Sequence, residues 1–285
     1  MKNCQKYKYQ VVTINLTTFN NHSSATLSLN KVEKEGDYFQ VQLTENIILE
    51  MIYIPKGQFI MGTPESEQGR SKDETPQHEV SIEPLFISKY PITQSQYLAV
   101  MNENPSFFQG DNKPVENISW FDAQNFCEKL SSLTQKKFRL LTESEWEYAC
   151  RAGTNTPFSF GKSITPELAN YKASYGYGEG GAGKWKQETT DVGSFYANDF
   201  GLYDLHGNVW EWCQDHWLEN YIDAPTDGSA WLNTSEEEED EEELPRVIRG
   251  GSWDDTAYYC RSGVRLWTLP QFKGKLIGFR VACDG

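Results

Sequence analysis

The feature that most constrains the fold of this chain is a long segment, residues 154–235, that lacks a regular hydrophobic period. It is rich in Gly, Tyr, Trp, Asn and Asp, and its apolar residues follow neither helical spacing nor the alternation of a strand. Loops of this length are uncommon in a compact domain, and they usually have a function or are ordered by a metal ion. We therefore expect most of the regular structure to lie before residue 154.

Three capped helices are predicted ahead of this segment. Each begins with a Ser or Thr whose hydroxyl can accept from a backbone amide of the first turn. Each also carries Gln, Asp or Glu three residues later, which can cap the amide of the Ser or Thr in return. The pairs are Thr93–Gln96, Ser119–Asp122 and Thr142–Glu145, and the helices cover 93–101, 119–133 and 142–153. Gly153 is the expected C-cap of the third helix.

Strand patterns dominate the N-terminal part of the chain. Residues 1–48 contain alternating, β-branched segments at 8–16, 26–32 and 38–45, and they predict a strand-rich extension that is too small to bury much core alone. The main domain is expected to cover 49–285, beginning with two short strands around Lys56 and Gly57. The run 236-EEEEDEEE-243 is expected to be a solvated, mobile insertion, and an adaptor role for it is an alternative.

Composition and charge disfavour several classes of function. The net charge is −15 and no basic stripe is present, which argues against nucleic acid as the main ligand. No apolar stretch approaches the roughly 20 residues of a membrane helix, and the N-terminus lacks the apolar core of a secretory signal. The 6 cysteines are too widely spaced for a disulfide framework or a zinc knuckle, so free thiols are expected. Together these features predict a cytoplasmic protein.

Six sequence segments occur in one order along the chain: 58-QFIMG-62, 90-YPIT-93, 139-RLLTESEWEYACRAG-153, 201-GLYDLHGNVWEW-212, 248-IRGGSW-253 and 277-IGFRV-281. Together they resemble the formylglycine-generating enzyme (sulfatase-modifying factor) domain over about residues 49–283. The resemblance implies an α+β, C-type lectin fold. Such a fold has two main helices, a small twisted antiparallel sheet and extensive irregular loops.

The same resemblance bears on catalysis. Oxidase members of the family use two cysteines to hold copper(I), and here the second position matches Cys260 while the first falls on Asp255. A carboxylate is a hard ligand that suits Cu(I) poorly. We therefore expect no copper and no catalytic residue. A divergent oxidase that acts on a peptidyl cysteine is the alternative.

Another branch of this fold matches more closely, namely the bacterial variable proteins that are diversified by retroelements. Their constant frame resembles 250-GGSW-253, 260-CRS-262, Arg265 and 277-IGFR-280 in this chain. The resemblance implies a C-terminal variable region, 249–283, and predicts that ligand contacts come from positions between the frame residues. These are Asp254, Asp255, Thr256, Tyr258, Tyr259, Val264, Leu266, Trp267, Thr268, Gln271, Phe272, Gly274, Lys275 and Leu276.

The composition of this segment independently favours recognition. Tyr and Trp offer a large contact area with few torsions to immobilise, and small polar neighbours offer adaptable hydrogen bonds, as in antibody paratopes. Trp253 and Phe279 are expected in the core, whereas Tyr258, Tyr259, Trp267 and Phe272 are expected at the surface. The partner at this site is predicted to be a protein, a peptide, a glycan or a small molecule.

The segment 204-DLHGNVWEW-212 matches a calcium loop of the resembling family. The resemblance implies that Asp204, the carbonyls of Gly207 and Val209, and Glu211 hold one structural calcium ion. Carboxylate and carbonyl oxygens suit this hard cation. The alternative is that the two carboxylates cap turns without a metal. A second calcium site of the family would begin at Asn170, but Lys184 or its neighbours replace its expected Asp.

Overall fold

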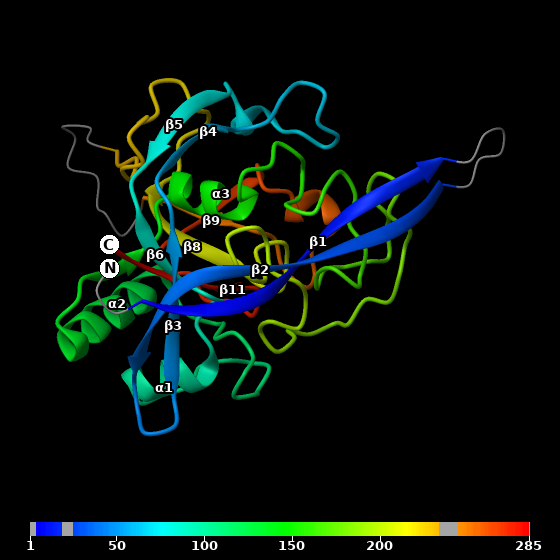
Figure 1. The fold of residues 1–285 in the computed structure, drawn as a ribbon. Helices are drawn as coiled ribbons and strands as arrows, with labels where there is room; N and C mark the ends of the chain where they lie inside the picture. Colours follow the sequence, from blue (N-terminus) through cyan, green and yellow to red (C-terminus); the bar gives the residue numbers. More distant parts are fainter. Residues whose placement is uncertain (1–3, 19–24, 234–243, 285) are drawn as a thin grey trace.

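The computed structural model describes residues 4–18, 25–233 and 244–284 (Figure 1). Within these residues the chain forms three α-helices and strands that are mostly antiparallel, which confirms the predicted α+β class. No helix in this part of the chain is both long and apolar enough to cross a membrane. The predicted acidic insertion, 236–243, lies outside the described residues.

The largest sheet joins the beginning of the chain to its end. Its six strands follow the order β1-β2-β3-β6-β12-β7, and each pairs antiparallel with its neighbours. Because the last strand lies between β6 and β7, both ends of the domain contribute to one core. The strands are β1 (Gln5–Thr18), β2 (Ala25–Gln42), β3 (Ile48–Ile54), β6 (Leu85–Ser88), β7 (Phe138–Leu140) and β12 (Val281–Asp284).

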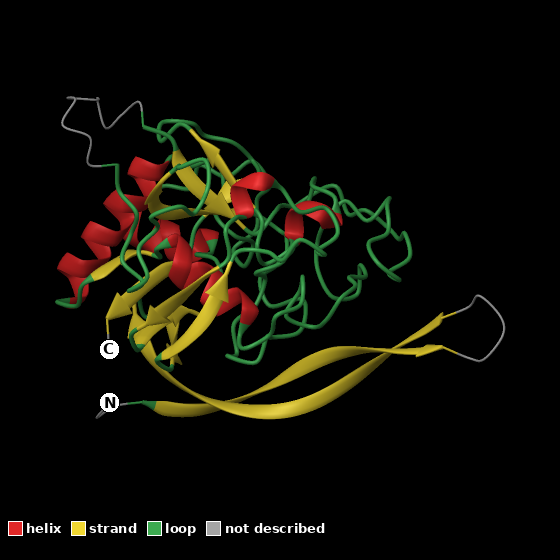
Figure 2. Ribbon diagram, turned by 90° about the horizontal axis from the view of Figure 1, so that it is seen from above, coloured by secondary structure: helices red, strands yellow, loops and turns green. Residues whose placement is uncertain are grey.

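The N-terminal strands form a long hairpin. Figures 1 and 2 show β1 and β2 leaving the body of the molecule as a twisted ribbon. The predicted segments 26–32 and 38–45 fall mostly within the single strand β2. This strand pairs with β3 from Tyr38 opposite Ile52 to Gln42 opposite Ile48, so the N-terminal extension continues the main sheet.

The three helices begin at the predicted caps. They are α1 (Gln94–Met101), α2 (Trp120–Thr134) and α3 (Glu143–Arg151), and all three capping boxes are present. The C-cap of α3 is Ala152, in the left-handed region with φ 44°, one residue before the predicted Gly153. Every residue of α3 is buried, including its Glu and Arg side chains. This helix therefore brings charge into the centre of the domain.

A second sheet supports the C-terminal segment. Its order is β10-β9-β8-β11, and a separate pair joins β4 (Gly57–Met61) to β5 (His78–Ile82). The prediction of an irregular segment at 154–235 is confirmed for residues 154–209, which contain neither a helix nor a strand and only isolated bridges. It is wrong for Trp210–His216, which form a strand. Short 3-10 helices occur at η1 (Lys72–Glu74) and η2 (Ala257–Cys260). The strands of the second sheet are β8 (Trp210–His216), β9 (Arg246–Arg249), β10 (Arg265–Thr268) and β11 (Ile277–Gly278).

Candidate functional site

Two arginines attach the C-terminal segment to α3. Arg265 of β10 makes a bidentate pair with Glu143, with N–O distances of 2.8 and 2.7 Å. Arg249 of β9 donates to Glu147, which also accepts from Arg151. Burial alone disfavours the charge of Glu147, but its two arginine partners keep the pKa of this carboxyl below the ordinary value. Buried carboxylates of one helix thus hold two strands of the second sheet.

Two further arginines join the segment to other parts of the domain. Arg261 donates to Glu67 at 2.6 Å and to Glu74 at 2.9 and 2.8 Å, so it connects the end of η2 to residues 67–74. Arg280 forms a bidentate pair with Glu211 of β8, at 2.6 and 2.8 Å. The four arginines are at most 2% exposed. Bidentate guanidinium–carboxylate pairs are among the strongest hydrogen-bonded contacts in proteins, so they hold this segment in one geometry.

A tight turn precedes η2. Gly250 and Gly251 have φ of 102° and 74°, a region that favours glycine. A Cβ at Gly251 would lie 2.7 Å from the Sγ of Cys260, so the turn packs against η2 without room for a side chain. Trp253 and Phe279 are 3% and 0% exposed, which confirms that both belong to the core.

Several predicted contact residues with large side chains lie at the surface. Tyr259, Leu266, Trp267 and Phe272 are 47%, 38%, 46% and 49% exposed. Gln271 and Lys275 are also exposed. Half-buried positions are Asp254, Asp255, Thr256, Tyr258, Thr268, Gly274 and Leu276. Six of the fourteen predicted positions are thus exposed, and seven are half-buried.

Three of the predicted contact positions have internal roles. Val264 is 5% exposed and packs in the same core cluster as Ile248 and Phe279, so the prediction of a surface contact is wrong for this residue. Asp255 accepts hydrogen bonds from the indole of Trp210 at 2.8 Å and from the amide of Ser252 at 3.1 Å. The half-buried Tyr258 packs edge-on against Tyr177, with ring centroids 5.0 Å apart.

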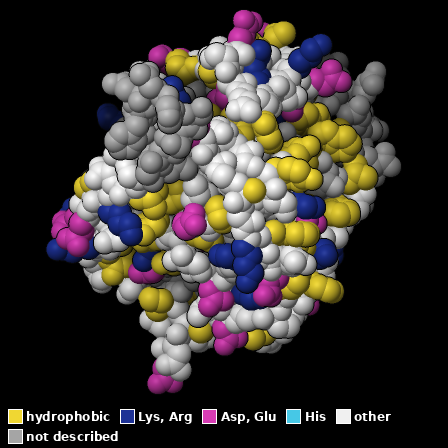
Figure 3. All heavy atoms as spheres, turned by 90° about the vertical axis from the view of Figure 1, so that its right-hand side faces the viewer, with side chains coloured by type: hydrophobic (Ala, Val, Ile, Leu, Met, Phe, Trp, Pro, Cys, Tyr) yellow, Lys and Arg dark blue, Asp and Glu magenta, His cyan; other side chains and the backbone are white. Residues whose placement is uncertain are grey.

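Other exposed residues near this segment were not predicted from the sequence. Leu269 is 40% exposed within the C-terminal segment, and Phe107 is 67% exposed although it lies far away in the sequence. The ammonium of Lys275 lies 5.6 Å from the centre of the Phe107 ring, so the two regions meet. The face displayed in Figure 3 likewise mixes small groups of hydrophobic side chains with acidic and basic ones. Only the fold reveals that residues near 107 border this surface.

Neither position of the family's copper pair presents a ligand at the surface. Cys260 is fully buried, and burial raises the pKa of its thiol well above the ordinary value. One carboxylate oxygen of the half-buried Asp255 accepts from Trp210 and Ser252. Elsewhere in the described residues, no group of three or more His, Cys, Asp or Glu side chains is arranged to hold a metal ion.

The predicted calcium loop offers part of its ligand set. Asp204 accepts from the amide of Gly193 at 2.7 Å through one oxygen, and its other oxygen is buried without a hydrogen-bond partner. Burial raises the pKa of this carboxyl to about 6. Both oxygens of Glu211 already accept from Arg280, and one also accepts from Trp146 at 2.7 Å. Calcium would have to share Glu211 with a guanidinium. The calcium site stays a prediction.

Comparisons with known proteins extend these observations. The sulfatase-modifying factor enzyme 1-like domain family matches residues 40–285. The structure of PvdO from Pseudomonas aeruginosa is 36% identical and superposes with a TM-score of 0.74, covering 87% of this chain and 98% of that one. Variable protein 1 of Treponema denticola is 25% identical with a TM-score of 0.69, covering 87% of this chain and 99% of that one.

Curated relatives include enzymes and longer proteins. The formylglycine-generating enzyme of Mus musculus is 26% identical over 300 residues, which cover 83% of this chain and 76% of the mouse protein. The serine/threonine-protein kinase pkn1 of Chlamydia caviae is 27% identical over 283 residues, and there the match spans only 40% of the relative's length. Proteins with different names thus share this domain.

Proposed function

We propose that this chain, which belongs to the sulfatase-modifying factor enzyme 1-like domain family, is a non-catalytic ligand-binding protein of the retroelement-diversified kind. Its recognition surface is built from the C-terminal segment on a lectin-like scaffold. One observation carries this proposal. Within this segment the arginines are buried and paired, whereas large apolar side chains, among them Trp267 and Phe272, are about half exposed. Burying charge while exposing aromatic groups reverses the ordinary distribution of these residue types.

The physical chemistry of the exposed groups favours binding. Aromatic side chains bury a large area on association and lose few rotamers, so they dominate the energy of many interfaces. The buried arginine pairs hold the backbone that carries them, and a rigid scaffold lowers the entropic cost of recognition. The surface suits a protein, a peptide, a glycan or a small molecule that offers apolar area. This combination of a rigid frame and adaptable contacts is that of an antibody paratope.

The likeness to the Treponema variable protein supports diversification of this segment. Deep sequencing of codons 249–283 in a population of the source cells tests it. We expect substitutions at the exposed positions, such as Tyr259 and Trp267, and none at the frame arginines. A nearby copy of this stretch that differs at adenines should accompany them. An invariant segment without such a copy would contradict the proposal.

The second candidate is a divergent oxidase that acts on a peptidyl cysteine. The likeness to formylglycine-generating enzymes and the presence of Cys260 favour it. The buried thiol and the Asp255 at the other copper position weigh against it, because one inaccessible thiolate holds Cu(I) poorly. Purified protein incubated with copper(I), oxygen and a cysteine peptide distinguishes the two functions. We expect no aldehyde, and turnover that disappears in Cys260→Ala would establish the oxidase instead.

The adaptor alternative depends on the acidic run 236–243, which lies outside the described residues. Deleting this run separates it from the proposed function. Binding through the C-terminal surface should survive the deletion, since the frame contacts all come from other residues.

A further inference from the structure

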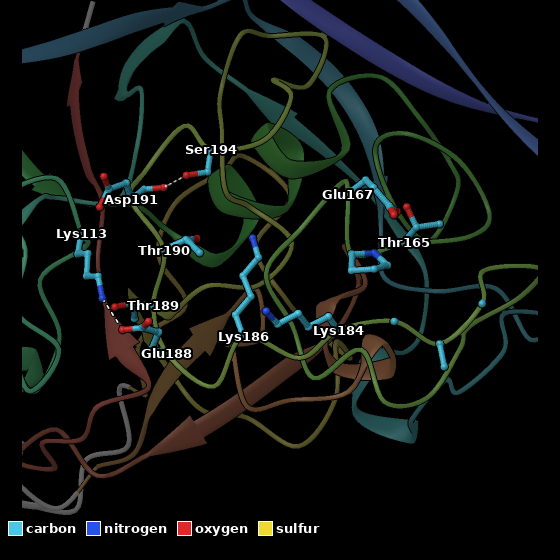
Figure 4. A pocket seen from close by; sticks show the side chains of 14 residues that line it. Lys113, Thr165, Glu167, Lys184, Lys186, Glu188, Thr189, Thr190, Asp191 and Ser194 are labelled. Atoms are coloured by element: carbon cyan, nitrogen blue, oxygen red, sulfur yellow. Dashed lines mark hydrogen bonds and ion pairs between the residues drawn. The ribbon is translucent and has the colours of Figure 1, made fainter.

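We propose that a second site binds a small zwitterionic molecule, such as an amino acid or a short peptide, in a polar cavity formed by residues 165–167 and 181–194 with Lys113. The cavity has a volume of about 920 Å³. This is within the range of small-molecule sites, which is about 300–1,000 Å³. Figure 4 shows the side chains that line it. None of them belongs to the C-terminal recognition surface.

The charges of the cavity are balanced but mostly unpaired. Three lysines and three carboxylates line it. Lys113 pairs with Glu188 at 2.7 Å. The remaining four charged groups make no ion pair within the described part of the chain; they are Lys184, Lys186, Glu167 and Asp191. Figure 4 shows the two lysines near the middle of the view, with Asp191 on one side and Glu167 on the other.

The residue between the two lysines is anchored outside the cavity. Trp185 stacks on Trp253 at 6.2 Å between ring centroids and donates its indole N–H to the carbonyl of Trp253 at 2.8 Å. Lys184 and Lys186, on either side of this anchored residue, both line the cavity.

Lys186 has no ion-pair partner among the described residues. Its side chain is exposed, and its ammonium lies 4.4 Å from the centre of the Phe195 ring. Burial lowers the pKa of Lys186, and the field of Asp204 opposes this shift only in part. A carboxylate that entered the cavity would supply an opposite charge close to this ammonium.

The opposing carboxylates favour a zwitterion over a simple anion. An anion attracted by Lys184 and Lys186 would also meet the negative charges of Glu167 and Asp191, which would weaken its binding. A cation attracted by Glu167 and Asp191 would likewise meet the positive charges of the two lysines. A molecule that carries both a carboxylate and an ammonium satisfies both signs at once, and like-charge contacts exclude the singly charged forms.

Calorimetric titration with three forms of triglycine tests the proposal on the full chain. The free peptide carries both charges, the N-acetylated peptide only the carboxylate, and the C-amidated peptide only the ammonium. We expect the free form to bind with a Kd of about 1 mM, and each capped form to bind about threefold more weakly, as the loss of one exposed ion pair predicts. The double variant Lys184→Met/Lys186→Met should no longer distinguish free from amidated peptide.

The matched variants separate the two halves of the cavity. Glu167→Gln/Asp191→Asn should lose the distinction between free and acetylated peptide. Lys129→Met, at an exposed position of α2, should bind like the parent protein. Equal binding of acetylated and free peptide would show a plain anion site and overturn the proposal. So would the absence of binding by free triglycine, or unchanged selectivity in both double variants. These outcomes leave the C-terminal surface untouched, so the two proposals fail separately.

Discussion

At the scale of single residues, exposure separates the scaffold from the groups that meet a ligand. Arg265 is 2% exposed and Trp267 is 46% exposed, although both belong to the same short strand. The side chain of Arg265 faces inward, where its guanidinium pairs with Glu143, and the side chain of Trp267 faces water. An exposed aromatic side chain lowers solubility, and its burial in a complex with a ligand offsets this cost. Buried frame residues such as Arg265 should be sensitive to substitution, and exposed residues such as Trp267 should tolerate it.

Replacing Arg261 by Met tests the role of the buried pairs. The change leaves Glu67 and Glu74 without their shared counter-ion, so we expect the free energy of unfolding to fall by about 3–5 kcal/mol. Lys34→Met is the control, because it breaks a pair with Asp199 in which both side chains are about 40% exposed. That pair should contribute less than about 1 kcal/mol. Urea titrations of both variants measure the free energy of unfolding that each one loses. Similar losses would contradict the role of the buried arginine pairs in holding the segment.

Thiol accessibility provides a second test at this scale. Native protein treated with iodoacetamide near pH 8 should be labelled at the half-buried Cys4 and not at Cys260. The Cys260 thiol is enclosed, and burial raises its pKa, so little thiolate forms there. Mass spectrometry of the digested protein reads out both sites, with urea-unfolded protein as the reference for full labelling. Labelling of Cys260 at the rate of Cys4 would indicate a reactive thiol and would favour the oxidase.

Residue types predicted the frame better than the contacts. Local motifs contain Gly250, Gly251, Trp253 and Phe279. Those motifs predicted the tight turn and the two core residues. Val264 lies between frame residues like its neighbours, yet it faces the core, since only the strand geometry decides which way it points. The glutamate partners of the arginines come from distant segments, and no spacing in the sequence indicates them.

At the scale of elements, local signals were reliable and pairings were not. The three helix starts were predictable because capping boxes involve residues only three positions apart. The hairpin β1–β2 was predicted as shorter strands, since nothing in the sequence states that β2 continues through residues 33–37. The pairing of β12 with β6 joins residues about 200 positions apart, and its pairing with β7 joins residues about 140 apart, which no local pattern encodes.

The turn before η2 should not tolerate a side chain. Gly251→Ala would force a residue with Cβ into φ of 74° and place that atom 2.7 Å from the Cys260 sulfur. We expect the free energy of unfolding to fall by at least about 2 kcal/mol. Gly181→Ala is the matched control, because no atom lies within 4 Å of its added Cβ. Thermal and urea unfolding compare the two, and an unchanged Gly251→Ala would show that the turn is not closely packed.

Metal removal tests the loop around Asp204. We expect the melting temperature to be higher in calcium than in chelator, because the ion would pair with the Asp204 oxygen that lacks a hydrogen-bond partner. A free calcium concentration about 100-fold above Kd would stabilise the fold by about 2.7 kcal/mol. Asp204→Ala should remove this difference, whereas Asp223→Ala, an exposed position outside the loop, should keep it. Equal melting temperatures with and without calcium would contradict the calcium site.

At the scale of the whole molecule, one scaffold supports different chemistry through a few positions. The fold was predictable from the order of six motifs, and the structural likeness to PvdO and to the Treponema variable protein agrees with it. Residues 154–209 were predictable as irregular but not in their path, because such backbone follows tertiary contacts instead of a period. The strand β8, which lies within the predicted irregular segment 154–235, was missed. The cavity beside Lys186 belongs to this part of the chain and was not foreseen.

The most direct test of the central claim is the free energy of unfolding of a variant in which Tyr259, Leu266, Trp267 and Phe272 are all replaced by Ser. If these side chains are exchangeable contacts on a rigid frame, the variant should keep the native circular dichroism spectrum. Its stability should fall by no more than about 2 kcal/mol, since exposed positions contribute about 0.5 kcal/mol each. A loss above about 4 kcal/mol, or a non-native spectrum, would show that these residues hold the domain together and would contradict the account.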